Sequence, residues 1–222
     1  MRGIAVIDSV PPASADQLIS EFRRGRKVLL VLDQSDGEQT GVVAMAAEYC
    51  EADDVTFMAR QARGLVSLAL TEERCEQLNL PPMVDPATSG AVKLSIEAST
   101  GIDTGISAAD RARTVRVAVA ADAKPSDLVQ PGHIFPVATL NGGVLIRTGA
   151  AEAGVDLASL AGLTPAAVFA EVLDKQGEMA NAEALVEFAD THELMVGRVT
   201  DLVDYRLNHS RTVDLIRSGL VQ

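Results

Sequence analysis

The stretch from Thr104 to Pro136, TGISAADRARTVRVAVAADAKPSDLVQPGHIFP, carries the most information about the fold. Residues 107–120 within it predict a helix. Polar turns follow, and the stretch ends on Ile134-Phe135-Pro136, an apolar run that indicates a loop entering the core. His133 lies at the start of that loop, directly after Pro131-Gly132. The stretch therefore predicts a helix, a turn and a histidine at the edge of a packed core.

Outside this stretch, short apolar runs alternate with helical patterns along the chain. Strands are expected at residues 27–32, 41–46, 65–70, 92–96, 144–146, 168–173 and 195–199. Helices are expected at residues 14–24, 53–62, 157–163, 182–192 and 200–208, with a short one between 71 and 81. A hairpin turn is expected at Lys175-Gln176-Gly177. With 222 residues and 47% hydrophobic content, we expect one α/β domain over residues 1–222, a mixed sheet covered by helices.

The composition excludes several classes of partner. The formal net charge is −12 and the pI about 4.6, whereas nucleic-acid binding draws its affinity from clustered Lys and Arg. The one basic cluster, residues 23–27, lies at an expected helix end where cations suit the helix dipole, the alternative being a polyanion contact. Apolar runs are too short to cross a bilayer, and the N-terminus lacks a signal-peptide core. We expect a cytoplasmic protein without nucleic-acid or membrane partners.

Only two cysteines are present, Cys50 and Cys75. Two cysteines cannot define a disulfide framework, so we expect core or surface thiols in a reducing compartment.

His133 and Glu171 are the first candidates for chemistry. An unperturbed imidazole titrates near neutral pH and suits proton transfer; the alternative is a satisfied structural histidine. Glu171 lies in an otherwise apolar strand, where a buried carboxylate is costly unless it is paired. We expect it to be the neighbour of His133, the alternative being a side chain that points to water.

Arg147 and the loop at residues 33–42 are weaker candidates. Arg147 lies among glycines, where a guanidinium and exposed backbone amides suit a phosphate or carboxylate, or else a surface salt bridge. Glu38 and Asp36 offer oxygen ligands for Mg²⁺, but carboxylates on a loop are more often solvated.

Four motifs together resemble the 3,4-dihydroxy-2-butanone 4-phosphate synthase family. They are TGISAADR from Thr104, AKPSDLVQPGHIFP at 123–136, GGVLIRTG at 142–149 and GEMA at 177–180. The resemblance covers nearly the whole chain, and the run at 123–136 is its most specific part. It implies a mixed α/β sandwich and a homodimer with the site at the interface. It also implies the Mg²⁺-dependent conversion of ribulose 5-phosphate into the four-carbon riboflavin precursor and formate.

The resemblance also assigns roles to residues of this chain. It makes His133 and Glu171 catalytic, and Glu38 a metal ligand that also contacts substrate. It places Arg147, Thr104, Ser67 and Thr148 among the substrate-binding residues. Positions where the family has other residues are Gly37, Thr40, Val42, Ser67, Ala150 and Ala151.

These substitutions remove a metal-binding imidazole at Ala150 and a carboxylate at Val42. From them we expect a diverged family member, performing acid-base chemistry on a small oxygenated substrate without tightly bound Mg²⁺, in secondary metabolism. Its reaction would be an enolisation, isomerisation, elimination or lyase step. One alternative is an ordinary synthase of riboflavin biosynthesis that uses Mg²⁺. The other is a non-catalytic subunit that binds a metabolite or an active homologue.

Overall fold

One mixed sheet forms the centre of the molecule. The structure, a computed structural model, describes residues 12–34, 37–84 and 91–209. Within them, seven strands pair in the order β4-β5-β3-β6-β2-β1-β7. They are β1 (Val28–Asp33), β2 (Gln39–Ala46), β3 (Ser67–Thr71), β4 (Ile96–Ala98), β5 (Leu128–Thr139), β6 (Ala166–Glu171) and β7 (Met195–Arg198). Two of the pairings, β1 with β7 and β3 with β5, are parallel and the others antiparallel.

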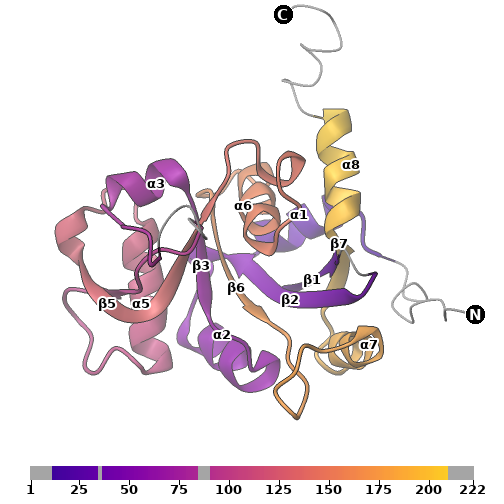
Figure 1. Cartoon of the computed structure of the whole chain (residues 1–222), viewed down its shortest axis with the longest axis horizontal. Helices are drawn as coiled ribbons and strands as arrows, with labels where there is room; N and C mark the ends of the chain where they lie inside the picture. Colours follow the sequence, from indigo (N-terminus) through magenta and orange to yellow (C-terminus); the bar gives the residue numbers. More distant parts are fainter. Residues whose placement is uncertain (1–11, 35–36, 85–90, 210–222) are drawn as a thin grey trace, which may run out of the picture.

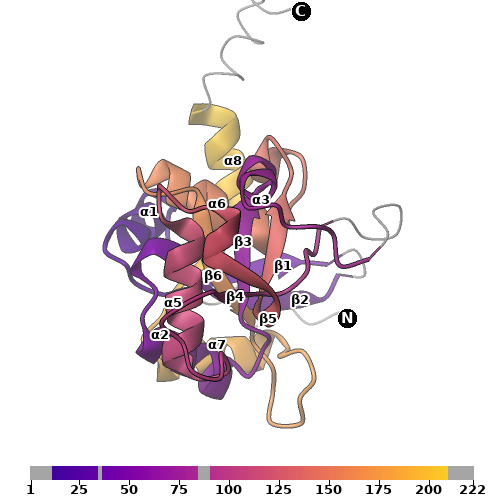
Figure 2. The same ribbon diagram turned by 90° about the vertical axis from the view of Figure 1, so that its left-hand side faces the viewer.

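Helices cover both faces of the sheet, so the expected mixed α/β architecture is confirmed (Figure 1). One apolar cluster joins the sheet to α1 (Ala15–Arg23), α6 (Ala150–Leu160) and α8 (Val199–His209). The other joins it to α2 (Ala52–Phe57), α3 (Glu72–Gln77), α5 (Ala108–Val119) and α7 (Ala182–Thr191). Figure 2 shows α5 alongside β4 and β5.

Side-chain caps fix several helix starts where the sequence predicts them. Ser14 accepts a hydrogen bond from Gln17 N, and Thr71 accepts one from Arg74 N. Ser107 and Asn181 do the same for α5 and α7. Each cap satisfies a backbone N–H that the first helical turn leaves without a partner. The basic cluster at residues 23–27 lies at the C-terminal end of α1, as expected.

Two expected elements are wrong around the glycine-rich segment. Residues 144–146 are not extended, because Gly142 and Gly143 have φ of +102° and +60° and turn the chain into a short 3₁₀ helix (Gly143–Leu145). The helix expected at 157–163 instead spans Ala150–Leu160. The first half of this helix is rich in alanine, so its sequence does not show the alternation of polar and apolar faces from which a helix is predicted. It also contains Gly154, where an added Cβ would lie 2.6 Å from Ala167 Cβ, so close packing on the sheet compensates for poor helix propensity.

Smaller shifts occur elsewhere. The strand expected at 92–96 appears as β4 at Ile96–Ala98, preceded by isolated bridges at Val92 and Lys93. The expected helix at 53–62 is split into α2 and a π-helical turn (Met58–Ala62). In the described part of the chain, no helix has the length and apolar character to span a membrane. Residues 1–11, on which the signal-peptide expectation rests, and Asp36 lie outside the described residues.

Candidate active site

The register of three neighbouring strands brings His133 and Glu171 to the same end of the sheet. Ser67 on β3 lies opposite Phe135 on β5 and Phe169 on β6. His133 precedes Phe135 by two residues, and Glu171 follows Phe169 by two. Because side chains alternate along a strand, both lie on the same face of the sheet as Ser67. Two strand spacings separate them, about 10 Å, so they share a site without touching.

His133 lies within a strand and not in the expected loop. Ile96 and Glu97 are consecutive on β4, yet they pair with Ile134 and Val129 on β5. The four intervening residues, Gln130 to His133, form a bulge. A bulge bends its strand and redirects a side chain, and here it is made by the Pro-Gly pair that suggested a loop.

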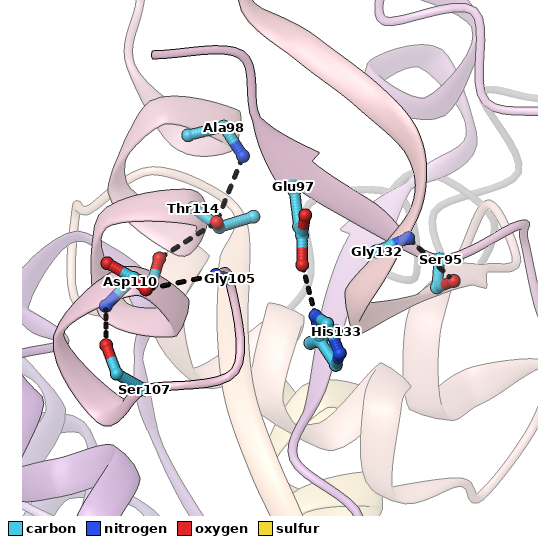
Figure 3. A network of polar contacts seen from close by, with 9 residues as sticks. All are labelled: Ser95, Glu97, Ala98, Gly105, Ser107, Asp110, Thr114, Gly132 and His133. Carbon is cyan, nitrogen blue, oxygen red and sulfur yellow. Dashed lines mark hydrogen bonds and ion pairs between the residues drawn. The ribbon is translucent and has the colours of Figure 1, made fainter. Parts of the chain in front are cut away.

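The carboxylate beside His133 is Glu97, not Glu171. Glu97 Oε1 lies within hydrogen-bonding distance of His133 Nδ1 (Figure 3). The imidazole is 42% exposed and the Glu97 side chain 15%. Gly132 N donates to Ser95 Oγ at 3.1 Å and holds the bulge against β4. Sequence reasoning missed Glu97; the available signal was a single carboxylate in the alternating run at 92–98.

Glu171 ends β6, where three chain segments meet. It lies opposite Val42 on β2, and Val172 N donates to Gly41 O at 2.9 Å. On the β3 side, Gly64 packs so closely that an added Cβ would lie 2.1 Å from Glu171 O. Ser67 is buried, and its hydroxyl donates to Leu65 O at 3.3 Å. By the strand register, Ser67 lies two residues further along β3 than the level of His133 and Glu171.

Glu38 lies at the entry to β2, at this same end of the sheet, and is exposed. Its carbonyl accepts a hydrogen bond from Gln34 N at 2.8 Å, and Gln34 Nε2 donates to Thr40 Oγ1 at 2.8 Å. These bonds close the loop that carries Glu38.

The donor set suits only a sparse magnesium site. Among residues 12–34, 37–84 and 91–209, no three His, Cys, Asp or Glu side chains gather in a metal-binding group. Ala150 offers no ligand at the first position of α6. Mg²⁺ usually keeps several waters and takes one or two protein carboxylates plus substrate oxygens. Glu38 can supply one such carboxylate.

Arg147 lies apart from His133. Its Nε donates to Glu152 Oε1 at 2.8 Å, and its Nη2 contacts the same oxygen and Ala138 O. Glu152 is 1% exposed and also accepts from Leu140 N, so the pair is built into the fold. Ala138 is five residues from His133 along β5, about 16 Å. Arg147 retains its two Nη1 donors for an anion.

The two threonines lie in different places. Thr148 is exposed beside Arg147. Thr104 is exposed next to Gly105, whose added Cβ would lie 1.8 Å from Glu97 Oε1. Thr104 thus adjoins the His133–Glu97 pair, whereas Thr148 belongs to the Arg147 loop. A separate cleft of about 410 Å³ opens beyond Glu171, between residues 172–176 and α7.

Known proteins resemble this chain over most of its length. The family model for 3,4-dihydroxy-2-butanone 4-phosphate synthase matches residues 16–205. A protein of Pseudomonas syringae with that name is 50% identical over 201 residues, covering 89% of this chain and 54% of its own length. A Pseudomonas aeruginosa protein of the same name is 48% identical, with coverage of 90% and 56%. The chain therefore spans about half the length of both relatives.

Solved structures show the same similarity. RibBX of A. baumannii, described as a two-domain 3,4-dihydroxy-2-butanone 4-phosphate synthase, superposes with a TM-score of 0.84 at 46% identity, covering 90% of this chain and 59% of RibBX. A 3,4-dihydroxy-2-butanone 4-phosphate synthase described in complex with two magnesium ions gives 0.82 at 33% identity, with coverage of 89% and 98%.

These relatives overturn the expectation of a diverged, non-synthase enzyme of secondary metabolism. Two relatives that share about half of their aligned residues with this chain are named as the synthase. They support the alternative of an ordinary synthase. The expectation was wrong because it gave a few side-chain losses more weight than the scaffold and the retained His133, Glu171 and Arg147. The chain belongs to the 3,4-dihydroxy-2-butanone 4-phosphate synthase family, a family of enzymes.

Proposed function

We propose that this chain converts ribulose 5-phosphate into 3,4-dihydroxy-2-butanone 4-phosphate and formate, a step of riboflavin biosynthesis. The observation that carries the proposal is the 50% identity to a protein named as that synthase over 89% of the chain. The common sheet end of His133 and Glu171 supports it, because the reaction needs proton transfers at more than one carbon of the sugar.

Each candidate residue has a task in this reaction. His133 removes and returns protons with Nε2, since Nδ1 faces Glu97. Glu171, about 10 Å away across β3, serves a different carbon from His133. Thr104 and Ser67 contact the substrate from the two sides of the histidine. Arg147 and Thr148 are the candidates for binding the phosphate, since a guanidinium provides charge-assisted hydrogen bonds.

Glu38 is the residue that would hold Mg²⁺, together with water and substrate oxygens. A bound Mg²⁺ supplies Lewis-acid polarisation of a carbonyl oxygen. A related structure described with two magnesium ions supports testing the metal.

We further propose a cytoplasmic homodimer with the site at its interface and no nucleic-acid partner. Support comes from the family resemblance, the acidic composition and two buried, unpaired cysteines.

The test is incubation of the purified chain with ribulose 5-phosphate, with and without Mg²⁺, followed by enzymatic measurement of formate. We expect formate and the four-carbon phosphate in equal amounts, and their loss in His133→Ala. Glu76→Gln on the exposed face of α3 is the matched control and should keep full activity. Absence of formate from a folded preparation at every Mg²⁺ concentration would refute the proposal.

A further inference from the structure

Glu97 is held in place more firmly than the histidine it contacts. Its side chain is 15% exposed, against 42% for His133. It occupies the space left by two glycines. An added Cβ would lie 1.8 Å from Glu97 Oε1 at Gly105, and 2.4 Å from Glu97 Cγ at Gly132. Gly105 also has φ of +79°, a conformation that side-chain-bearing residues rarely adopt.

The strand that carries Glu97 is anchored to α5 through buried polar groups (Figure 3). Ala98 N donates to Thr114 Oγ1 at 3.0 Å, and that hydroxyl donates to Asp110 O at 2.9 Å. Asp110 Oδ2 accepts from Gly105 N at 3.0 Å. Thr114 is fully buried and Asp110 is 8% exposed. The network therefore fixes both the residue after Glu97 and the glycine that lies against its carboxylate.

A carboxylate at Nδ1 determines which imidazole nitrogen can act as a base. An ionised carboxylate only accepts hydrogen bonds, so Nδ1 must carry the proton. In the neutral ring Nε2 then holds a lone pair, which is available to remove a proton. The same contact holds the ring plane and stabilises the imidazolium that forms after proton transfer, as a buried carboxylate does for a catalytic histidine elsewhere.

We infer that Glu97 is a positioning residue, which sets the tautomer and orientation of His133 through Nδ1. The inference rests on the proposed function for its kinetic consequence, but the tautomer is a property of the protein alone. Glu97 acts through His133 and need not touch the substrate.

The tautomer is directly measurable because the chain has only three histidines. With ¹⁵N-labelled histidine, two-bond ¹H–¹⁵N spectra distinguish protonated from unprotonated ring nitrogens, and His133→Ala assigns the His133 signals. At a pH where the ring is neutral, we expect Nδ1–H for the unmodified chain. Glu97→Gln should lose that preference, because an amide can also donate to Nδ1.

Kinetics provide the second readout. Glu97→Gln should lower kcat by about tenfold or more with KM changed less than about twofold, since only proton transfer is affected. Glu97→Asp, which keeps the carboxylate, should recover part of kcat. Glu76→Gln should change neither kcat nor the His133 spectrum. Thermal unfolding of each variant separates these effects from loss of the fold.

The outcomes separate the two proposals. If the unmodified chain makes no formate but Glu97→Gln shifts the His133 tautomer, the proposed function fails and the positioning role stands. If Glu97→Gln leaves both the tautomer and kcat unchanged, the positioning role is wrong whatever the reaction is.

Discussion

Ala150 is the residue that we expect to limit Mg²⁺ binding most directly. It occupies the first position of α6, where the family resemblance places a histidine ligand. If Glu38 is the metal ligand, as the resemblance implies, the absence of that imidazole leaves Mg²⁺ with Glu38, water and substrate oxygens as ligands. We therefore expect this chain to need a higher Mg²⁺ concentration for half-maximal activity than a site with both ligands.

Restoring the imidazole should strengthen Mg²⁺ binding. Ala150→His is expected to lower the Mg²⁺ concentration for half-maximal formate release by about tenfold, equivalent to ~1.4 kcal/mol. Ala150→Leu adds bulk without a ligand and should show no such gain. Calorimetric titration with Mg²⁺ gives a readout independent of turnover. Equal Mg²⁺ affinity in Ala150→His and the unmodified chain would contradict this account.

Burial lowers the reactivity of the two cysteine thiols. Burial raises the pKa of the Cys50 and Cys75 thiols from 9.0 to about 12. The thiolate is the reactive form, so neither side chain should react with iodoacetamide in the folded chain near about pH 8. Intact-mass measurement should show no adduct in the folded state and two in concentrated urea. Rapid labelling of the folded chain would contradict the burial of these thiols.

The same pKa shifts predict the direction of alkaline destabilisation. In the unfolded chain the thiols begin to ionise near 9.0, whereas in the folded chain they remain protonated up to about 12. The unfolded state therefore binds fewer protons in this interval, and the free energy of unfolding falls as pH rises through it. Replacing both cysteines with alanine should flatten this part of the stability profile.

At the scale of elements, Gly64 packs against the backbone at the end of β6. An alanine there would bring Cβ to 2.1 Å from Glu171 O and 2.6 Å from Glu171 N. Both are backbone atoms, so a side-chain rotation cannot relieve the clash. Gly64→Ala is therefore expected to destabilise the chain by about 1–3 kcal/mol and to displace Glu171, lowering activity.

Urea unfolding followed by circular dichroism measures the loss of stability in Gly64→Ala. Formate release measures the loss of activity that a displaced Glu171 would cause. Gln61→Ala changes an exposed residue of the same segment and should stay within about 0.5 kcal/mol of the unmodified chain. A Gly64→Ala variant as stable and as active as Gln61→Ala would show that β6 can shift freely at Glu171.

Elements with strong local signals were predictable from sequence. Ser14 and Thr71 cap helices as expected, and the alternation of apolar strands with helices correctly indicated a mixed sheet. The glycine-rich segment was not predictable, since the positive φ of Gly142 and Gly143 and the packing of Gly154 on Ala167 depend on tertiary contacts. The partner of His133 was missed for the same reason. The sequence predicted turns and a loop where β5 (Leu128–Thr139) forms, so the pairing of β5 with β4 and the contact between His133 and Glu97 could not be anticipated.

At the scale of the whole molecule, the site end of the sheet carries apolar side chains that remain exposed. Ile106, which is 55% exposed, follows the Gly105 that lies against Glu97. Val129 pairs with Glu97 across the strands and is 46% exposed. Leu65, two residues before Ser67, is 54% exposed. Exposed apolar groups gathered around one site are typical of an interaction surface, and a second copy of the chain is the partner that the family resemblance implies.

If this surface is the dimer interface, placing a charge on it should separate the subunits. Light scattering on the purified chain is expected to give twice the chain mass of 23.3 kDa. Ile106→Glu should give the single-chain mass, because dimer formation would bury the introduced carboxylate of each subunit without a partner of opposite charge. Leu207→Glu, on the outer part of α8 and 38% exposed, should remain dimeric. If the unmodified chain is a monomer, the proposed dimer is wrong. If Ile106→Glu remains dimeric, the interface lies elsewhere on the surface.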